Sequence, residues 1–548
     1  MLQGAIMDMP LMISSAIEHA AAFHGGTPII ARDVDGTIHR YTYADAHRRT
    51  KRVAKALGRL GVRPGDRIGT LGWNTHRHFE LFYGVSGSGA VMHPVNPRLY
   101  ADQLVYIINH AEDAWLFIDA ATLTLAEQLA PRLKSVKGFV LMAGRSAMPA
   151  GTTLAPLLCY EELLAAESED YVWPQFDERT ASSICYTSGT TGDPKGVVYS
   201  HRSSVLVAML FTEWVYRGAR NGAMETLMSL APLFHANGWY FPYIAPMTGS
   251  KLVLPGRNYE PSMLYELFDG ERVTVTAGVP TMWLTLLDWM ERQGRTLSHL
   301  RVVYSAGTAA PPSLFEKFAA MGVELCQLWG MTEALGLTTP SLHPGALDLP
   351  AEQQLAQRMK AGGRASFGAQ LRIVDDAERP LAHDGVAVGH LRVKSPWISS
   401  GYFKGAGEAL DGEGWLKTGD VASIDPDGYI AIVDRSKDLI KSGGEWISSI
   451  ALENAACGHP EVLQAAVIAA FHPKWQERPL LVVTRRPGSQ LDRETLLEFL
   501  RPGVASWWVP DDVVFVSEMP MTATGKIHKL TLREQFRDYT LPTVDHRP

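Results

Sequence analysis

Short apolar runs alternate with amphipathic stretches through the middle of the chain. Ala181–Tyr186 and Leu300–Ser305 have the composition of buried strands, while Pro312–Met321 has helical apolar spacing and stops at a glycine. Strands that alternate with helices in this way predict an α/β fold with a parallel sheet. The same pattern predicts strands at 226–230, 273–276 and 323–328, and helices after residue 200 and from about residue 281.

Polar or glycine-rich segments follow these strands. They are Thr187–Gly196, His235–Trp239, Gly278–Thr281, Gly307–Pro311 and Trp329–Glu333. In open parallel sheets, ligands bind outside the carboxyl ends of the strands. The five segments therefore predict one composite site at a single edge of the sheet.

The pattern changes after residue 365 to short strands and tight turns, such as Gln370–Val374, Gly389–Lys394 and the turn at 425–428. This indicates a small β-subdomain. Charged residues at 434–438 interrupt two apolar runs, and a new α+β unit follows. We expect a large domain of stacked α/β sheets with a β-subdomain over 1–433, a hinge at 434–438 and a small α+β domain over 439–548.

Composition narrows the class of protein. The 548 residues carry a net charge of −7 without a basic stretch, which argues against nucleic acid as a partner. The four cysteines lie far apart and have no C-x-x-C spacing, as in a reduced cytoplasmic protein, and the histidines show no zinc-binding pattern. No secretory signal or transmembrane stretch is evident.

The loop after residue 186 has the chemistry of a phosphate cradle. Its hydroxyls donate hydrogen bonds, its glycines let backbone N–H groups approach an anion, and its lysine adds charge. It lacks the Walker A spacing, and the alternative interpretation is a flexible linker. The residues concerned are Thr187, Ser188, Gly189, Thr190, Thr191, Gly192 and Lys195.

Further motifs lie downstream in a fixed order. They are Gly307-Thr-Ala-Ala-Pro311, Trp329-Gly-Met-Thr-Glu333, Thr418-Gly-Asp420, Asp434–Ile447 (DRSKDLIKSGGEWI) and Pro520-Met-Thr-Ala-Thr-Gly-Lys526. Each alone is compatible with an ordinary loop, helix start, turn or surface lysine. Together they resemble the superfamily of adenylate-forming enzymes, which unites acyl-CoA synthetases, firefly luciferase and non-ribosomal peptide adenylation domains. The resemblance covers the chain from about residue 40 to its end.

This resemblance implies roles for the nucleotide-binding residues. Trp329, where the family more often has tyrosine, stacks on adenine beside Gly330 and Met331, and the turn Gly307, Thr308 and Ala309 flanks the adenine. Asp420 accepts both ribose hydroxyls, with Arg435 beside it. Thr332 binds the α-phosphate, and Glu333 holds Mg²⁺ with Thr190.

The resemblance also assigns an acyl site. Leu233–Trp239 (LFHANGW) is similar to the family's acyl-lining segment, so His235 and Trp239 are expected to line the site, together with Gly278 and Ala306. Each of the first two has an alternative as an ordinary core residue. Trp239 would be either a movable gate or a fixed floor of the acyl pocket.

Residues near the C-terminus divide between two half-reactions. Lys526 resembles the lysine that bridges the carboxylate and the α-phosphate during adenylation. Lys437 aligns with the hinge about which the small domain rotates. Gly443, Gly444 and Trp446 resemble the loop past which the pantetheine arm of CoA reaches the adenylate.

The resemblance implies an acid–thiol ligase that uses ATP, Mg²⁺ and CoA. Segments 440–450 and 472–479 are most similar to medium- and long-chain fatty acyl-CoA synthetases, a group that includes methylthioalkanoate ligases and often forms homodimers. The alternatives are a specialised acid such as 3-methylthiopropionate or an aryl acid, transfer of the acyl group to a carrier protein or to oxygen, or a nucleotide-binding pseudoenzyme.

Overall fold

The computed structural model describes residue 2 and residues 4–187, 193–218, 224–360, 362–405, 409–443, 445–522 and 526–542. Ser188, Gly189, Thr190, Thr191, Gly192 and Gly444 lie outside the described residues.

The predicted parallel sheet is present, with seven strands in the order β14-β13-β12-β10-β11-β1-β2. Its strands are parallel except for the edge strand β2, which is antiparallel to β1. Four of the polar segments follow its strands β10, β12, β13 and β14, as predicted. The strands are β1 (Pro28–Arg32), β2 (Ile38–Thr42), β10 (Thr226–Ser229), β11 (Lys251–Leu254), β12 (Val275–Gly278), β13 (Val302–Ser305) and β14 (Glu324–Gln327).

The fifth polar segment belongs to a second seven-stranded sheet, in the order β7-β6-β5-β3-β4-β8-β9. The prediction that all five segments follow strands of a single sheet is therefore wrong for this one, while the predicted helix after residue 200 is present. The β-branched residues after the loop form β9, which pairs antiparallel with β8 before the helix begins at His201. The strands are β3 (Arg67–Leu71), β4 (Val91–Pro94), β5 (Asp113–Ile118), β6 (Phe139–Leu141), β7 (Leu157–Cys159), β8 (Ala181–Tyr186) and β9 (Gly196–Ser200).

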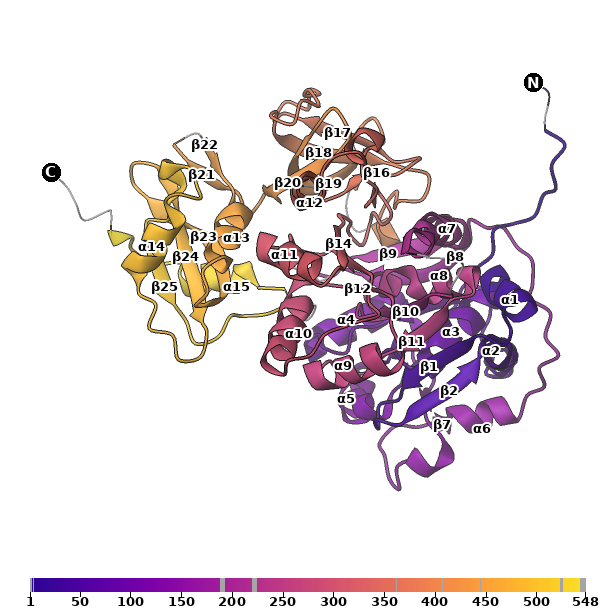
Figure 1. The fold of residues 1–548 in the computed structure, drawn as a ribbon. Coiled ribbons are helices and arrows are strands. Elements are labelled where there is room, and N and C mark those ends of the chain that lie inside the picture. The colour runs from indigo at the N-terminus through magenta and orange to yellow at the C-terminus, as the bar shows by residue number, and fades with distance from the viewer. Residues whose placement is uncertain are drawn as a thin grey trace.

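Helices lie between the two sheets and on their outer faces (Figure 1). The alternation of side chains along β1 shows how this works, because Ile29 and Ala31 face the middle layer while Ile30 faces the outer helices. The middle layer holds α1 (Ser14–Phe23), α2 (Tyr43–Arg59), α3 (His76–Gly87), α7 (His201–Gly218) and α8 (Phe241–Thr248). The outer helices are α9 (Pro261–Gly270), α10 (Pro280–Arg292) and α11 (Pro312–Ala320) on the first sheet, and α4 (Ala101–Ala111) and α5 (Leu123–Leu129) on the second.

Three smaller sheets follow along the described chain, the first of them the short pair β15 (Thr338–Thr339) and β16 (Arg364–Ala365). The β-subdomain is an antiparallel sheet of β17 (Gln370–Val374), β18 (Gly389–Lys394), β19 (Leu416–Ile424) and β20 (Ile430–Arg435). The last sheet lies at the left of Figure 1, beside α10 and α11. It contains β21 (Ile440–Ser442), β22 (Glu445–Ile447), β23 (Val462–His472), β24 (Gln476–Arg485) and β25 (Asp512–Phe515), packed with α13 (Ser449–Cys457), α14 (Arg493–Leu500) and α15 (Lys529–Gln535).

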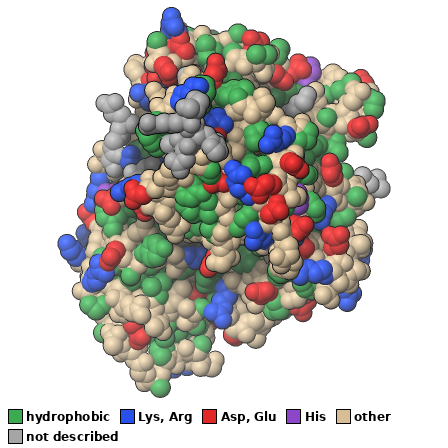
Figure 2. Space-filling view, turned by 90° about the vertical axis from the view of Figure 1, so that its left-hand side faces the viewer, with side chains coloured by type: hydrophobic (Ala, Val, Ile, Leu, Met, Phe, Trp, Pro, Cys, Tyr) green, Lys and Arg blue, Asp and Glu red, His purple; other side chains and the backbone are tan. Residues whose placement is uncertain are grey.

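The surface carries charges of both signs. On the face in Figure 2, lysine and arginine side chains lie among aspartate and glutamate side chains instead of gathering in one patch. Within the described ranges, no helix has the combination of length and apolarity needed to cross a membrane.

Candidate active site

The side chain of Lys526 lies against the turn that follows β13. A Cβ placed on Gly307 would lie 3.5 Å from the lysine Cε and 3.7 Å from its Nζ, so the end of the lysine side chain lies within contact distance of this turn. The lysine backbone is held by Thr522, whose hydroxyl oxygen accepts from the Lys526 N–H at 3.0 Å. Burial, and then the positive charge of Arg435, lower the pKa of Lys526 to about 8, against an opposing effect of Asp420. A residue near the C-terminus therefore reaches the edge of the first sheet.

Asp420 organises the neighbouring polar groups. It is 2% exposed on β19, opposite Arg435 of β20. Its Oδ1 lies 2.6 Å from the Arg435 Nε, and its Oδ2 accepts from the Trp329 Nε1 at 2.9 Å. Burial raises the pKa of Asp420, whereas Arg435 and the indole hydrogen bond oppose the rise. Each carboxylate oxygen keeps a second lone pair, so a vicinal diol could still donate to both.

Hydrogen bonds to backbone groups fix the two turns that follow β13 and β14. Gln327 closes the first, because its Oε1 accepts from the Ala310 N–H at 3.0 Å and its Nε2 donates to the Thr308 carbonyl at 3.2 Å. The second is closed by Met331 and Ala334, which exchange hydrogen bonds of 3.1 and 2.9 Å. Thr308 and Ala309 are exposed, whereas Gly330, Met331 and Thr332 are half-buried. Both turns thus present backbone at the same edge as Lys526.

Glu333 is a nearly buried carboxylate, 7% exposed, at the end of the second turn. Its Oε1 accepts a hydrogen bond of 2.8 Å from the Tyr402 hydroxyl. Lys195, an exposed residue after the phosphate loop, holds its Nζ 4.7 Å from the centre of the Tyr402 ring. Mg²⁺ is commonly held by one or two carboxylates plus substrate phosphates, and the single fixed carboxylate of Glu333 fits that requirement.

A small cavity lies beside these groups. Burial, and then the charge of Lys526, lower the pKa of His235 to about 4, so its imidazole is neutral near pH 7. Of the residues predicted to line an acyl site, His235 and Trp239 border this cavity. Gly278 instead faces Trp283, whose Cζ2 would lie 2.9 Å from a Cβ at that position. The lining residues are Arg98, Leu230, Ala231, Pro232, Phe234, His235, Trp239, Val279 and Met282.

Trp239 occupies an unusual backbone. Five successive residues, Ala236–Tyr240, have positive φ values of 38°, 48°, 59°, 48° and 68°, and only the third is glycine. Left-handed backbone costs roughly 1–2 kcal/mol per non-glycine residue. The buried Asn237 holds the turn, because its Nδ2 donates to the Ser183 hydroxyl at 2.9 Å. Such strain persists where surrounding contacts fix it, and it is common at functional sites.

The remaining predicted residues belong to the hairpin after the expected hinge, to that hinge itself and to the position before Gly307. Gly443, at φ +61°, and Trp446 belong to the hairpin of β21 and β22, where Gly443 donates to the Trp475 carbonyl at 2.9 Å and the Trp446 ring lies 6.1 Å from that of His390. Burial lowers the pKa of Lys437, just after β20. Ala306 packs against the core between the two sheets. The structure therefore brings the nucleotide candidates together with Lys526, whereas the hairpin contacts described above are with Trp475 and His390.

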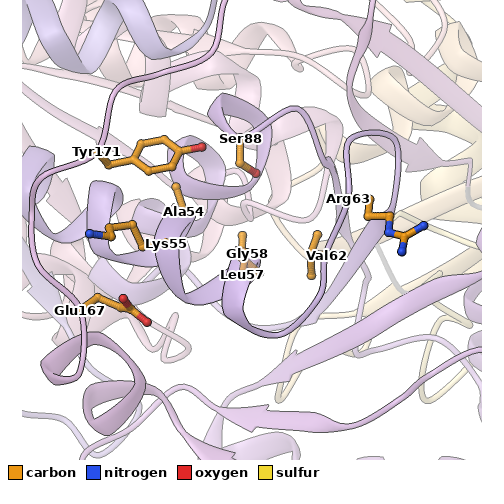
Figure 3. A pocket seen from close by; sticks show the side chains of 9 residues that line it. All are labelled: Ala54, Lys55, Leu57, Gly58, Val62, Arg63, Ser88, Glu167 and Tyr171. Carbon is orange, nitrogen blue, oxygen red and sulfur yellow. The ribbon is translucent and has the colours of Figure 1, made fainter.

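A larger hollow, about 340 Å³, lies elsewhere, between α2 and the segment after α6 (Tyr160–Ala165) (Figure 3). Two of its charged groups already have partners: the Lys55 Nζ donates to the Ser168 hydroxyl at 2.6 Å, and Glu167 forms an ion pair with Arg59 at 3.0 Å. This hollow lacks the site residues described above.

Several residues of the site were not expected from the sequence. Tyr402 contacts Glu333, Tyr199 donates to the Thr332 carbonyl, and Arg98 and Met282 line the cavity. Aromatic and arginine residues at scattered positions give no local signal, so only the folded chain reveals them.

Comparison with known proteins agrees with this geometry. Residues 17–403 match the family described as AMP-binding enzyme, and residues 451–526 match the AMP-binding enzyme C-terminal domain. The chain is 46% identical to a 3-methylmercaptopropionyl-CoA ligase of Ruegeria lacuscaerulensis, over 98% of this chain and 99% of the relative. It is 44% identical to a long-chain-fatty-acid–CoA ligase of Thermus thermophilus, over 97% of each.

Among solved structures, an anthranilate CoA ligase, AuaEII, in complex with anthranoyl-AMP has the same fold. The TM-score is 0.82 at 24% identity, over 96% of this chain and 98% of that one. The co-substrates of AMP-binding CoA ligases are ATP, Mg²⁺ and CoA. The chain belongs to the AMP-binding enzyme family, as an acyl-CoA synthetase.

Proposed function

We propose that the described arrangement is the one in which the enzyme joins a carboxylic acid to AMP. The observation that carries this proposal is the position of Lys526 against Gly307, next to Asp420 and Arg435. An ammonium group at that point would meet the negative charge that grows on the α-phosphate during attack by the carboxylate. Preorganised charge of this kind is commonly the largest contribution to catalysis.

The other nucleotide contacts follow from the same placement. Trp329 would stack on adenine, and the second lone pairs of Asp420 would accept the ribose hydroxyls while Arg435 holds the carboxylate. The Thr332 hydroxyl would donate to the α-phosphate, and the turn Gly307–Ala309 would border the base. The phosphate loop, which continues outside the described residues, would bind the β- and γ-phosphates with Lys195.

Glu333 would hold Mg²⁺, together with Thr190 outside the described residues. When bound, the ion would neutralise part of the triphosphate charge. The carboxylate oxygen then attacks the α-phosphorus, the acyl–phosphate bond forms and pyrophosphate leaves.

For the second step we propose a rotation of residues 439–548 relative to residues 1–433, about a hinge at 434–438 that includes Lys437. The rotation would withdraw Lys526 and bring Gly443, Gly444 and Trp446 to the adenylate, where the CoA thiol attacks the acyl carbon and AMP leaves. The hairpin's contacts with Trp475 and His390 support two arrangements, because Lys526 and the hairpin would then meet the acyl carbon at different steps.

The acid we propose is apolar and unbranched, of medium or longer chain. The cavity beside Lys526 is lined mostly by apolar side chains, among them Leu230, Val279 and Met282. Each buried methylene contributes about 0.8 kcal/mol to binding. Acetate would therefore be a poor substrate.

A second candidate is 3-methylthiopropionate. The cavity is small and is bordered by Met282, Trp239 and Phe234, and sulfur makes favourable contacts with aromatic rings. The relative at 46% identity is a 3-methylmercaptopropionyl-CoA ligase. Aryl acids are the third class to test.

The test separates the two half-reactions. Pyrophosphate release is measured over a panel of straight-chain acids, 3-methylthiopropionate and benzoate, and thioester formation is measured from synthetic acyl-AMP and CoA. Lys526→Ala should abolish the first step and spare the second. Equal loss of both steps would contradict the proposed role of Lys526, and acyl-AMP release without acyl-CoA would favour a different acceptor.

We further propose a homodimer that acts in the cytoplasm. The resemblance to the fatty acyl-CoA synthetase group supports the first. The wide spacing of the four cysteines along the sequence, without a C-x-x-C pair, supports the second. Light scattering on the purified enzyme tests the oligomeric state.

A further inference from the structure

The segment Ser399–Gly405 connects the β-subdomain to the phosphate site. Its first residue is bonded to the second turn, because the Ser399 N–H donates to the Glu333 carbonyl at 2.9 Å. Three residues later, the Tyr402 hydroxyl donates to the carboxylate of the same glutamate at 2.8 Å. Glu333 is therefore held through both its backbone and its side chain by one short segment.

The ring of Tyr402 has a second contact on its face. The Lys195 ammonium lies 4.7 Å from the ring centre, within the range of a cation–π interaction. The ring also packs against a small apolar cluster formed by Cys185, Val197 and Tyr199 of the β8–β9 hairpin. One side chain thus contacts both the hairpin that carries the phosphate loop and the turn that carries Glu333.

The two residues after Tyr402 anchor the segment to α4 and, through it, to the end of β8. The Phe403 ring lies edge-on to His110 at 5.6 Å, and His110 in turn is 2.7 Å from the Tyr186 hydroxyl. Lys404 forms an ion pair with Glu112 at 2.6 Å. These contacts hold the backbone on both sides of Tyr402, so its ring has little freedom to follow a moving partner.

We propose that Tyr402 is a positioning residue that keeps Glu333 and Lys195 apart and ready for the nucleotide. The hydroxyl fixes Oε1 of Glu333, so that Oε2 is the oxygen presented to a cation. The aromatic face holds the ammonium of Lys195, which would otherwise be free to neutralise the nearby carboxylate. The inference rests on the proposed function, in which Glu333 faces Mg²⁺ and Lys195 faces the triphosphate.

Loss of the Tyr402 hydroxyl should weaken the binding of MgATP but not that of AMP. Loss of the hydroxyl removes a hydrogen bond to a charged group, which is worth enough to weaken MgATP binding by about tenfold to a hundredfold. AMP has no β- or γ-phosphate, so its affinity should stay within about twofold. Thioester formation from synthetic acyl-AMP should likewise be unchanged.

The experiment uses Tyr402→Phe, which keeps the ring, Tyr402→Leu, which removes both contacts, and Tyr216→Phe, at a 61% exposed tyrosine of α7, as the matched control. Binding of MgATP and of metal-free AMP is measured by calorimetry, and the environment of Mn²⁺ in the Mn·ATP complex by electron paramagnetic resonance. Thermal unfolding of each variant checks that the fold is intact.

The expected result is that Tyr402→Phe loses MgATP affinity and alters the Mn²⁺ spectrum while AMP binding is kept, with a larger loss in Tyr402→Leu. MgATP binding at the wild-type level in Tyr402→Phe, or a parallel loss of AMP and MgATP, would overturn the proposal. Equal losses in the two variants would overturn the part that concerns Lys195. Failure of the wild-type enzyme to release pyrophosphate with any acid would instead refute the proposed function, because the binding measurements need no acid.

Discussion

The pKa of Lys526 predicts how adenylation depends on pH. At about 8 it lies well below the ordinary lysine value, because the site buries the ammonium near Arg435. Only the protonated lysine can oppose charge on the α-phosphate. The protonated fraction of the free enzyme falls from about nine-tenths at pH 7 to about one-tenth at pH 9. The kcat/KM of adenylation, which reports free-enzyme groups, should therefore fall roughly tenfold over that interval.

Lys526→Arg provides the matched variant, since a guanidinium stays charged through pH 9. Its activity will be lower because its geometry differs, but its alkaline decline should be absent. The assay is pyrophosphate release at subsaturating ATP and saturating Mg²⁺ from pH 6 to pH 9.5. The pKa of His235 is about 4, so that residue does not titrate in this window.

Two results would refute this reasoning. A wild-type profile that is flat between pH 7 and pH 9 would mean that the lysine keeps an ordinary pKa or does not act in the first step. An alkaline decline of the same midpoint in Lys526→Arg would assign the titration to another group.

Three further variants test other parts of the site. Asp420→Asn should raise the KM for ATP about tenfold or more, because it loses the charge-assisted contact with Arg435 and one strong acceptor for the ribose, and a steady-state ATP titration measures this. Gly443→Leu should impair thioester formation but spare pyrophosphate release, because φ is +61° at this residue and a Cβ would lie 2.8 Å from the Trp475 ring. A parallel loss of both steps would contradict the separation of functions. Trp239→Ala should shift the preferred acid to longer chains if the indole is the floor of the pocket, and should change only the rates if it is a gate. The measurement is kcat/KM over a series of acids of increasing chain length, which should rise about fourfold per methylene until the chain meets the pocket wall.

Much of the fold could be predicted because local pattern and tertiary environment agree. The run Ala181–Tyr186 is apolar enough to be a buried strand, and Arg493–Leu500 has one apolar face and an aspartate before it that caps the helix. The small strands of the β-subdomain were visible because the glycine-containing turn at 425–428 separates them.

The sheet to which each strand belongs was harder to predict from the sequence. The chain has two parallel sheets of similar composition, and apolar strands alone do not reveal which sheet each joins. β8 pairs with β4, about ninety residues earlier, so the loop that begins at Thr187 follows a strand of the second sheet, whereas the turn Trp329–Glu333 follows a strand of the first. The contact of Tyr402 with Glu333 depends on the same long-range placement, which is why no motif predicted it.

The contacts around β20 limit where a rotation can occur. Asp434 pairs with Val421 in the β-subdomain sheet, and its Oδ2 also accepts from the backbone N–H and hydroxyl of Ser449, the first residue of α13. Arg435 is likewise held, by Asp420. The backbone that turns in the proposed hinge therefore begins after Arg435, near Lys437, and the turn must break the Ser449 contacts of a carboxylate that is 1% exposed. Hydrogen bonds to a charged group are worth about 1.5–3 kcal/mol each. While pyrophosphate is bound, its negative charge attracts Lys526 and so holds the small domain in place. Its departure weakens that attraction, so that rotation is favoured only after adenylation.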